Sequence, residues 1–142
     1  MKTIRWQLVM EGPPDVFPVL SAVDIDKRMH FGGYADKDRE CFVVFLLNNK
    51  NHIIAEELVT VGILNASLVH PREVFKSAIT ASAASIIIAH NHPSGDTGPS
   101  AEDRVVTKRL KEAGAILGIP LLDHVISGPL AKYFSFKEEG DL

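Results

Sequence analysis

At 142 residues the chain is long enough to form one domain with its own hydrophobic core. Hydrophobic residues make up 46% of the sequence and charged residues 23%, a balance that indicates a globular protein and excludes a disordered tail. The formal net charge of −3 disfavours a nucleic acid as the partner without excluding one, because nucleic-acid-binding proteins usually carry a basic surface.

The number of cysteines and the length of the apolar segments indicate in which cellular compartment the protein is expected. The single cysteine, Cys41, excludes an intrachain disulfide, and its position in the apolar run Cys41–Leu47 favours a buried thiol over a catalytic one. Charged residues interrupt the first six positions, which therefore do not resemble a signal peptide. No segment approaches the roughly 20 apolar residues needed to cross a bilayer. We expect a cytoplasmic protein without membrane association.

The first 35 residues predict one strand and one helix. Alternating apolar residues favour a short strand at 4–9, and a helix is expected at 21–29, ended by a pair of glycines. We assign residues 1–35 to an N-terminal strand/helix extension that packs on a second region. That region, residues 36–142, is expected to form the main domain.

A β-hairpin is expected next. The continuous apolar run Cys41–Leu47 is typical of a buried strand. Residues 48–51 are rich in asparagine and favour a turn, and residues 53–60 resume a strand-like pattern. The two strands are therefore expected to pair antiparallel.

The second half of the chain predicts alternating helices and strands. One helix is expected to carry an apolar stripe of Val105, Leu110, Ala113 and Leu117, and Gly118 is suited to end it. Together with the hairpin, this alternation predicts an α/β or α+β fold with a mixed sheet. The expected elements are a helix from Pro71, a central strand at 85–89, a helix at 100–117, and strands at 119–126 and 133–136.

Two histidines follow directly on the expected central strand. His90 and His92 lie two residues apart on an extended segment, so their side chains point to the same side and can reach one cation. A turn-rich loop then leads to Ser100 and Asp103, which share one face of the next helix. Two imidazoles and one carboxylate suit Zn²⁺ and leave a fourth position for water, as in catalytic sites.

Each half of this pattern has a simpler explanation. A His-x-His pair is common in proteins that bind no metal, and Ser100 with Asp103 also matches an N-terminal capping box. The explanations are compatible, because a cap fixes the direction in which the first helical turn faces. The strand, the paired histidines, the turning loop and the helix start together favour a metal site.

The spacing His90-x-His92, seven residues, then Ser100-x-x-Asp103 resembles the metal-binding motif of the JAMM metalloproteases, also called MPN+ or JAB. A wider similarity to the bacterial RadC branch runs from about residue 39 to the C-terminus. The resemblance implies an α/β fold of the cytidine-deaminase-like type, an α-β-α sandwich whose curved mixed β-sheet is flanked by helices. The segments that carry the RadC similarity are 62–67, 70–73, 89–95 and 122–126.

The resemblance also implies a zinc-dependent hydrolase that cleaves the amide bond of a peptide or isopeptide. One Zn²⁺ per chain would be held by His90, His92 and Asp103, and would lower the pKa of a water towards about 7. The hydroxyl of Ser100 would stabilise the oxyanion that forms during hydrolysis.

The family motif includes a glutamate on an upstream strand. Glu40 matches it best, because it opens the apolar run as the family glutamate does, and it would act as general base and then general acid. Glu56 and Glu57, on the next expected strand, are the alternatives. His124 is interpreted as a histidine that hydrogen-bonds a metal ligand and not as a ligand itself.

Two other functions are considered. The chain could be a non-catalytic MPN-like binding module, although the complete ligand set argues against this. It could also be a metal-dependent nuclease or a DNA-repair-associated accessory protein of the RadC family. The residues before the match lack the Gly-rich hairpin of the helix-hairpin-helix-like region in full-length RadC proteins, so the DNA-repair label gains no support. Exposed strand edges are compatible with a homodimer.

Overall fold

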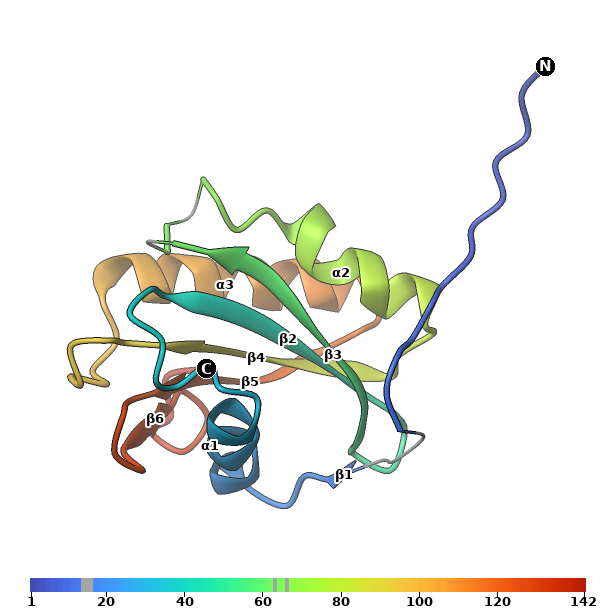
Figure 1. Cartoon of the computed structure of the whole chain (residues 1–142). Helices are drawn as coiled ribbons and strands as arrows, with labels where there is room; N and C mark the ends of the chain where they lie inside the picture. Colours follow the sequence, from blue (N-terminus) through green and yellow to red (C-terminus); the bar gives the residue numbers. More distant parts are fainter. Residues whose placement is uncertain (14–16, 63, 66) are drawn as a thin grey trace.

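A mixed β-sheet with helices on both faces forms the body of the chain (Figure 1). The computed structural model describes residues 1–13, 17–62, 64–65 and 67–142. The strands within them are β1 (Phe17–Pro18), β2 (Cys41–Leu47), β3 (His52–Val61), β4 (Ser85–Asn91), β5 (Leu121–Ser127) and β6 (Tyr133–Ser135). The helices are α1 (Ala22–Phe31), α2 (Pro71–Thr80) and α3 (Ala101–Leu117).

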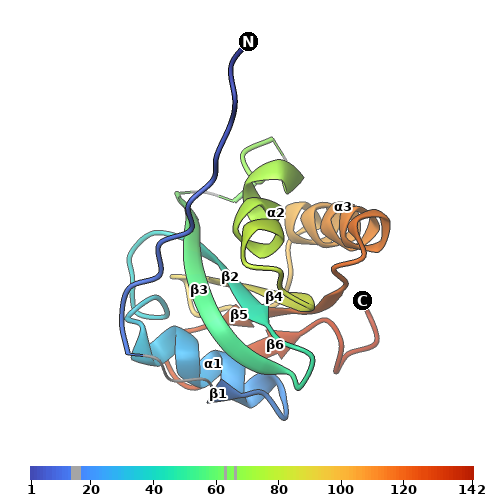
Figure 2. The ribbon, with the colours of Figure 1, turned by 90° about the vertical axis from the view of Figure 1, so that its right-hand side faces the viewer.

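The sheet has the strand order β1-β3-β2-β4-β5-β6. All neighbours pair antiparallel except β4 and β5, which are parallel and are connected through α3. Helices α2 and α3 cover one face and α1 covers the other (Figure 2). This arrangement confirms the predicted α/β sandwich with a curved mixed sheet. None of the three helices in the described part of the chain combines the length and apolarity needed to span a bilayer.

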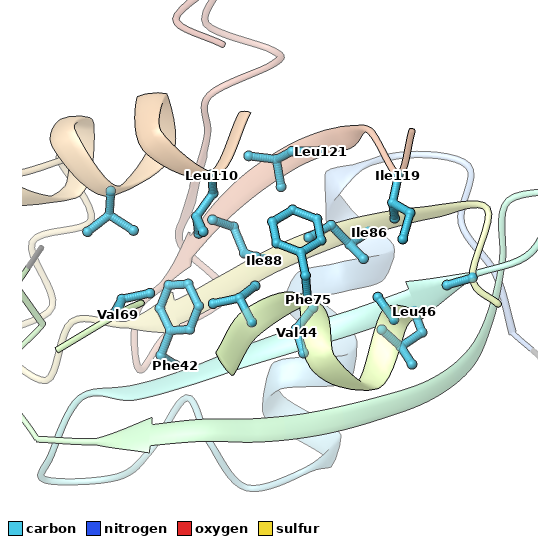
Figure 3. Packing of buried hydrophobic residues seen from close by; sticks show 14 of the residues in the cluster. Phe42, Val44, Leu46, Val69, Phe75, Ile86, Ile88, Leu110, Ile119 and Leu121 are labelled. Atoms are coloured by element: carbon cyan, nitrogen blue, oxygen red, sulfur yellow. The ribbon is translucent and has the colours of Figure 1, made fainter. Parts of the chain in front are cut away.

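Two hydrophobic layers hold the helices on the sheet. Strand β2 is buried along its whole length because successive side chains alternate between the two layers. Phe42, Val44 and Leu46 pack towards α2 and α3 (Figure 3). Val43, Phe45 and Leu47 of β2 pack towards α1. The continuous apolar run in the sequence therefore reflects a strand that is covered on both faces.

The predicted elements from residue 21 onward are confirmed, including the helix at 21–29, the antiparallel hairpin and the strand at 85–89. The strand expected at 4–9 is wrong. Within the described residues 1–13 the chain forms an arm without regular structure, and Ile4 and Trp6 are 77% and 72% exposed. Apolar alternation alone makes no strand where no neighbour pairs with the backbone. The division of the chain at residue 35 stays a prediction.

The apolar stripe expected on α3 is confirmed for Leu110, which is fully buried, and for Ala113, which packs against the core, but it is wrong at its two ends. Val105 and Leu117 are 51% and 45% exposed. The helix is turned so that its buried face begins with a carboxylate and also includes a hydroxyl and a glycine. The buried residues of α3 are Asp103, Val106, Thr107, Leu110 and Gly114.

Candidate metal centre

The structure brings His90, His92 and Asp103 together at the carboxyl end of β4. The Nε2 atoms of His90 and His92 lie 3.1 Å from Oδ1 and Oδ2 of Asp103, respectively. The two Nε2 atoms are 3.0 Å apart. One ligand atom from each residue lies within 4.8 Å of the others, so the group could hold a single metal ion.

The loop and the helix start direct Asp103 towards the histidines. After β4 the chain turns at Gly95, whose φ of 86° suits a residue without a side chain. Ser100 caps α3, since its Oγ accepts from the N–H of Asp103 at 3.1 Å and its own N–H donates to Asp103 Oδ2 at 2.8 Å. The same Oδ2 lies 3.1 Å from His92. The capping box therefore leaves the same carboxylate available as a candidate metal ligand.

Burial and charge make Asp103 a permanent anion. Its side chain is 2% exposed, that of His90 is fully buried, and that of His92 is 12% exposed, so the group is reached past His92. Burial alone would raise the pKa of Asp103, but hydrogen bonds from His90 and His92 outweigh it and hold this pKa well below its usual range. A buried anion beside two imidazoles attracts a cation.

The position of the proton on His90 follows from a chain of hydrogen bonds. The hydroxyl of Thr107 donates to the carbonyl of Asp103 at 2.7 Å, so its oxygen accepts from Nδ1 of His124 at 2.5 Å. Burial lowers the pKa of His124 well below its usual value, which keeps this imidazole neutral. Nε2 of His124 then accepts from Nδ1 of His90 at 2.8 Å. With its Nδ1 proton donated to His124, His90 can turn the lone pair of Nε2 to a bound cation in place of the contact with Asp103.

The second imidazole is oriented in the same way by the loop. Nδ1 of His92 lies 2.7 Å from the carbonyl oxygen of Asp96 and donates to it, which leaves Nε2 to face Asp103. Burial lowers the pKa of His92, but its hydrogen bonds to Asp103 and Asp96 outweigh this effect and raise it. Two nitrogen donors and one carboxylate, each held by a further hydrogen bond, fit a divalent cation.

Glu40 immediately precedes β2, whose Phe42 pairs with His90 of β4. Its Oε2 accepts from the N–H of Leu64 at 2.7 Å, and its backbone carbonyl accepts from Gly62 at 2.8 Å. The charge of Glu40 contributes to the raised pKa of His92, which places the two side chains within electrostatic reach.

The two alternative glutamates, Glu56 and Glu57, are not among the residues that the structure groups with the two histidines and Asp103. Glu56 accepts a hydrogen bond from Arg28 of α1 at 2.5 Å and forms an ion pair with it, and Glu57 is exposed on β3.

The interpretation of Cys41 as a buried thiol is confirmed. Burial raises the pKa of this thiol, which is the opposite of what a thiolate nucleophile needs.

Sequence reasoning missed two groups that orient the imidazoles and one buried amide that lies between them in the sequence. Thr107 lies four residues after Asp103, so helical spacing alone places both on one face. Asn91 lies between the two histidines, where alternation along a strand directs it to the opposite face. The carbonyl of Asp96 left no signal, because any residue carries that group.

Comparison with known proteins decides the family. The profile of the RadC-like JAB domain matches residues 23–141, starting inside α1 and therefore before the motifs recognised in the sequence. The chain belongs to the RadC-like JAB domain family. The wider JAB-domain family includes metallohydrolases, and the arrangement of His90, His92 and Asp103 in this RadC-like domain is compatible with such chemistry.

Relatives of this RadC-like domain occur in bacteria and archaea and bear the name UPF0758 protein. The chain is 58% identical over 126 residues to the relative from Rubrobacter xylanophilus, covering 88% of the chain and 54% of that protein. It is 47% identical over 149 aligned positions to the relative from Geobacillus thermodenitrificans, covering 91% and 66%. It is 54% identical over 105 residues to the relative from Methanosarcina mazei, which covers 74% of the chain and 45% of that protein. The chain thus spans about half to two thirds of these relatives.

Proposed function

We propose that this RadC-like JAB domain is a zinc-dependent hydrolase that cleaves an amide bond in a peptide or an isopeptide. The convergence of His90, His92 and Asp103, with both imidazoles oriented through Nε2, is the observation that carries the proposal. Two imidazoles and a carboxylate are the donors typical of catalytic zinc sites. When bound, one zinc ion per chain supplies Lewis acidity that activates water near neutral pH and polarises a carbonyl.

Glu40 is the proposed general base and acid. It takes the proton of the attacking water as the C–O bond forms, and it then passes this proton to the leaving amine as the C–N bond breaks. Its closeness to His92 and the hydrogen bond from Leu64 support this role over Glu56, which is paired with Arg28, and over Glu57, which is exposed.

Ser100 is the proposed oxyanion donor. Its hydroxyl oxygen accepts the backbone N–H of Asp103, and an accepting hydroxyl still has its own proton to donate. The hydroxyl could therefore cap α3 and stabilise negative charge on a substrate oxygen at the same time.

The test uses protein purified without a metal-affinity tag, loaded with zinc and assayed on an internally quenched peptide library. We expect one equivalent of zinc and metal-dependent cleavage by the wild type. Glu40→Gln should retain zinc and lose turnover by about 100-fold or more, whereas Asp103→Ala should lose zinc. Glu57→Gln, a matched carboxylate substitution on β3, should change neither property.

Two results would contradict the proposal. Full turnover by Glu40→Gln would remove the assigned base. Peptide binding by the zinc-loaded wild type without any cleavage would favour the non-catalytic MPN-like binding module instead.

A further inference from the structure

The side chain of Asn91 lies between the two histidines in sequence but on the other face of β4. Successive side chains of a strand point to opposite faces, so His90 reaches the metal group while Asn91 points to the segment that precedes β2. The side chain of Asn91 is completely buried. A buried amide must find hydrogen-bond partners, and those partners indicate what it does.

The amide of Asn91 holds the peptide units on both sides of Glu40. Its Oδ1 accepts from the N–H of Cys41 at 2.6 Å, and its Nδ2 donates to the carbonyl of Arg39 at 2.9 Å. The same Nδ2 lies 3.3 Å from the carbonyl of Lys37. One side chain therefore fixes the backbone immediately before and immediately after Glu40.

These bonds continue the connection between β2 and β4 beyond the strand pairing. The paired residues of the two strands end at Phe42 and His90. Past that point the side chain of Asn91 takes the place of the backbone ladder and reaches across to the segment that carries Glu40. On its other side, Glu40 is held by the N–H groups of Gly62 and Leu64.

We propose that Asn91 is a positioning residue that fixes Glu40 relative to the imidazoles of His90 and His92. The proposal rests on the proposed function, in which Glu40 is the base. Because Asn91 is the residue between the two histidines, any shift of its backbone moves the imidazoles and the base segment together. The separation between the base and the ligand set is thereby kept constant.

Only an amide of this length meets the requirement. The position needs one acceptor for Cys41 and a donor group for Arg39 and Lys37. Aspartate retains the acceptor but places negative charge beside two carbonyl oxygens. Glutamine retains the whole amide but moves it outward by one methylene.

The test compares Asn91→Asp and Asn91→Gln with Ser127→Ala as the matched control. Ser127 of β5 pairs with Asn91, is equally buried, and makes a 2.6 Å hydrogen bond to Asp26 that does not involve the segment of Glu40. Hydrogen exchange of the metal-free proteins is measured first. We expect exchange at residues 37–42 to rise about tenfold in Asn91→Asp, the loss of one net hydrogen bond, and to stay unchanged in Ser127→Ala.

Turnover of the best-cleaved library peptide by zinc-loaded protein is measured second. Both Asn91 variants should bind one equivalent of zinc with unchanged affinity and KM, while kcat falls about 100-fold, as expected for a misplaced catalytic group. In the Glu40→Gln background, Asn91→Gln should cause no further loss, because the group it positions is already gone. Asn91→Gln keeps the test decisive if Asn91→Asp does not fold.

The results separate the two proposals. Absence of cleavage by the wild type would overturn the proposed function, and the exchange measurement alone would then decide whether Asn91 holds the Glu40 segment. Unchanged exchange at residues 37–42 would overturn the positioning role. So would an equal loss of kcat when Asn91→Gln is introduced into the wild type and into the Glu40→Gln variant.

Discussion

Partners outside the ligand set place the protons of both histidines. Thr107 and His124 orient the imidazole of His90, and the carbonyl of Asp96 orients that of His92. A metal ligand must present a lone pair, so we expect the affinity of the site for an ion to depend on groups outside the ligand set.

Thr107→Val tests this dependence. The substitution keeps the shape of the side chain but removes the acceptor for Nδ1 of His124, so His124 no longer favours the tautomer that accepts from His90. We expect zinc affinity to fall about 10- to 100-fold, measured by competition with a chromophoric chelator. Thr80→Val is the control, because Thr80 makes a comparable 2.8 Å hydrogen bond to a carbonyl four residues earlier, at an exposed position of α2. Equal zinc affinities in the two variants would contradict the proposed series of hydrogen bonds from Thr107 through His124 to His90.

The affinity for zinc should also depend on pH through His92. The pKa of His92 is raised above its usual value of 6.5, so in the metal-free protein a proton competes with the metal below that raised pKa. The pKa of Asp103 lies well below its usual range, so this carboxylate contributes no competition near neutrality. Affinity should therefore decline by about tenfold per pH unit on acidification below the pKa of His92 and be level above it. Chelator competition over a pH series checks this slope, and a flat profile would contradict it.

At the residue scale, the sequence predicts contacts between residues that are close along the chain better than contacts between residues that only the fold brings together. The convergence of His90, His92 and Asp103 follows from alternation along a strand and from the first turn of a helix, both of which are local. The interpretation of His124 as a partner of a candidate ligand is confirmed by its 2.8 Å hydrogen bond to His90. The contacts of Asn91 join segments 50 to 54 residues apart, so no local pattern predicts them.

At the element scale, α3 combines two tasks on one face. Its buried face begins at Asp103 and ends at Gly114, where the helix approaches α2 and β5. A Cβ atom at Gly114 would lie 2.5 Å from the carbonyl oxygen of Ile119 and 3.3 Å from Phe75. This close approach explains a glycine inside a 17-residue helix despite its low helix propensity.

Gly114→Ala should therefore destabilise the fold while leaving the metal group intact. The added methyl forces α3 away from β5, and we expect a loss of about 1–3 kcal/mol in the free energy of unfolding, measured in urea. Because the clash is about three helical turns from Asp103, folded protein should still bind one equivalent of zinc. Lys111→Ala on the exposed face of α3 should change the free energy of unfolding by less than about 0.5 kcal/mol. If Gly114→Ala lowered the free energy of unfolding no more than Lys111→Ala does, the helix would accommodate the methyl group and the prediction would be wrong.

Helix α3 also shows why the ends of an element are easier to predict from sequence than the face that it buries. Caps and breakers such as Ser100 and Gly118 mark where α3 begins and ends, and both lie in the printed sequence. Which face is buried depends on what the helix meets. Hydrophobicity favoured Val105 and Leu117, but in the fold Asp103 and Thr107 face inward and contact the histidines.

At the scale of the whole molecule, the arm formed by residues 1–10 contributes little to the core. Its apolar side chains are exposed, and it leads away from the sheet in Figure 1. Deleting residues 1–10 should change the free energy of unfolding by less than about 1 kcal/mol, with zinc binding unaltered. Urea denaturation of the full and shortened chains makes the comparison. A larger loss would mean that the arm packs on α2, where Lys76 lies 5.9 Å from the ring of Trp6.

The outer edge of β3 has a further consequence for behaviour at high concentration. Among the described residues, the strand that pairs with this edge is β1, and it covers only Ile53 and His52. An open edge invites pairing between molecules and the growth of aggregates. The pairing of β3 with β2 shifts register twice, which coils the strand, and Glu57 adds charge beside it. A curled, acidic border is a poor template for a flat intermolecular sheet.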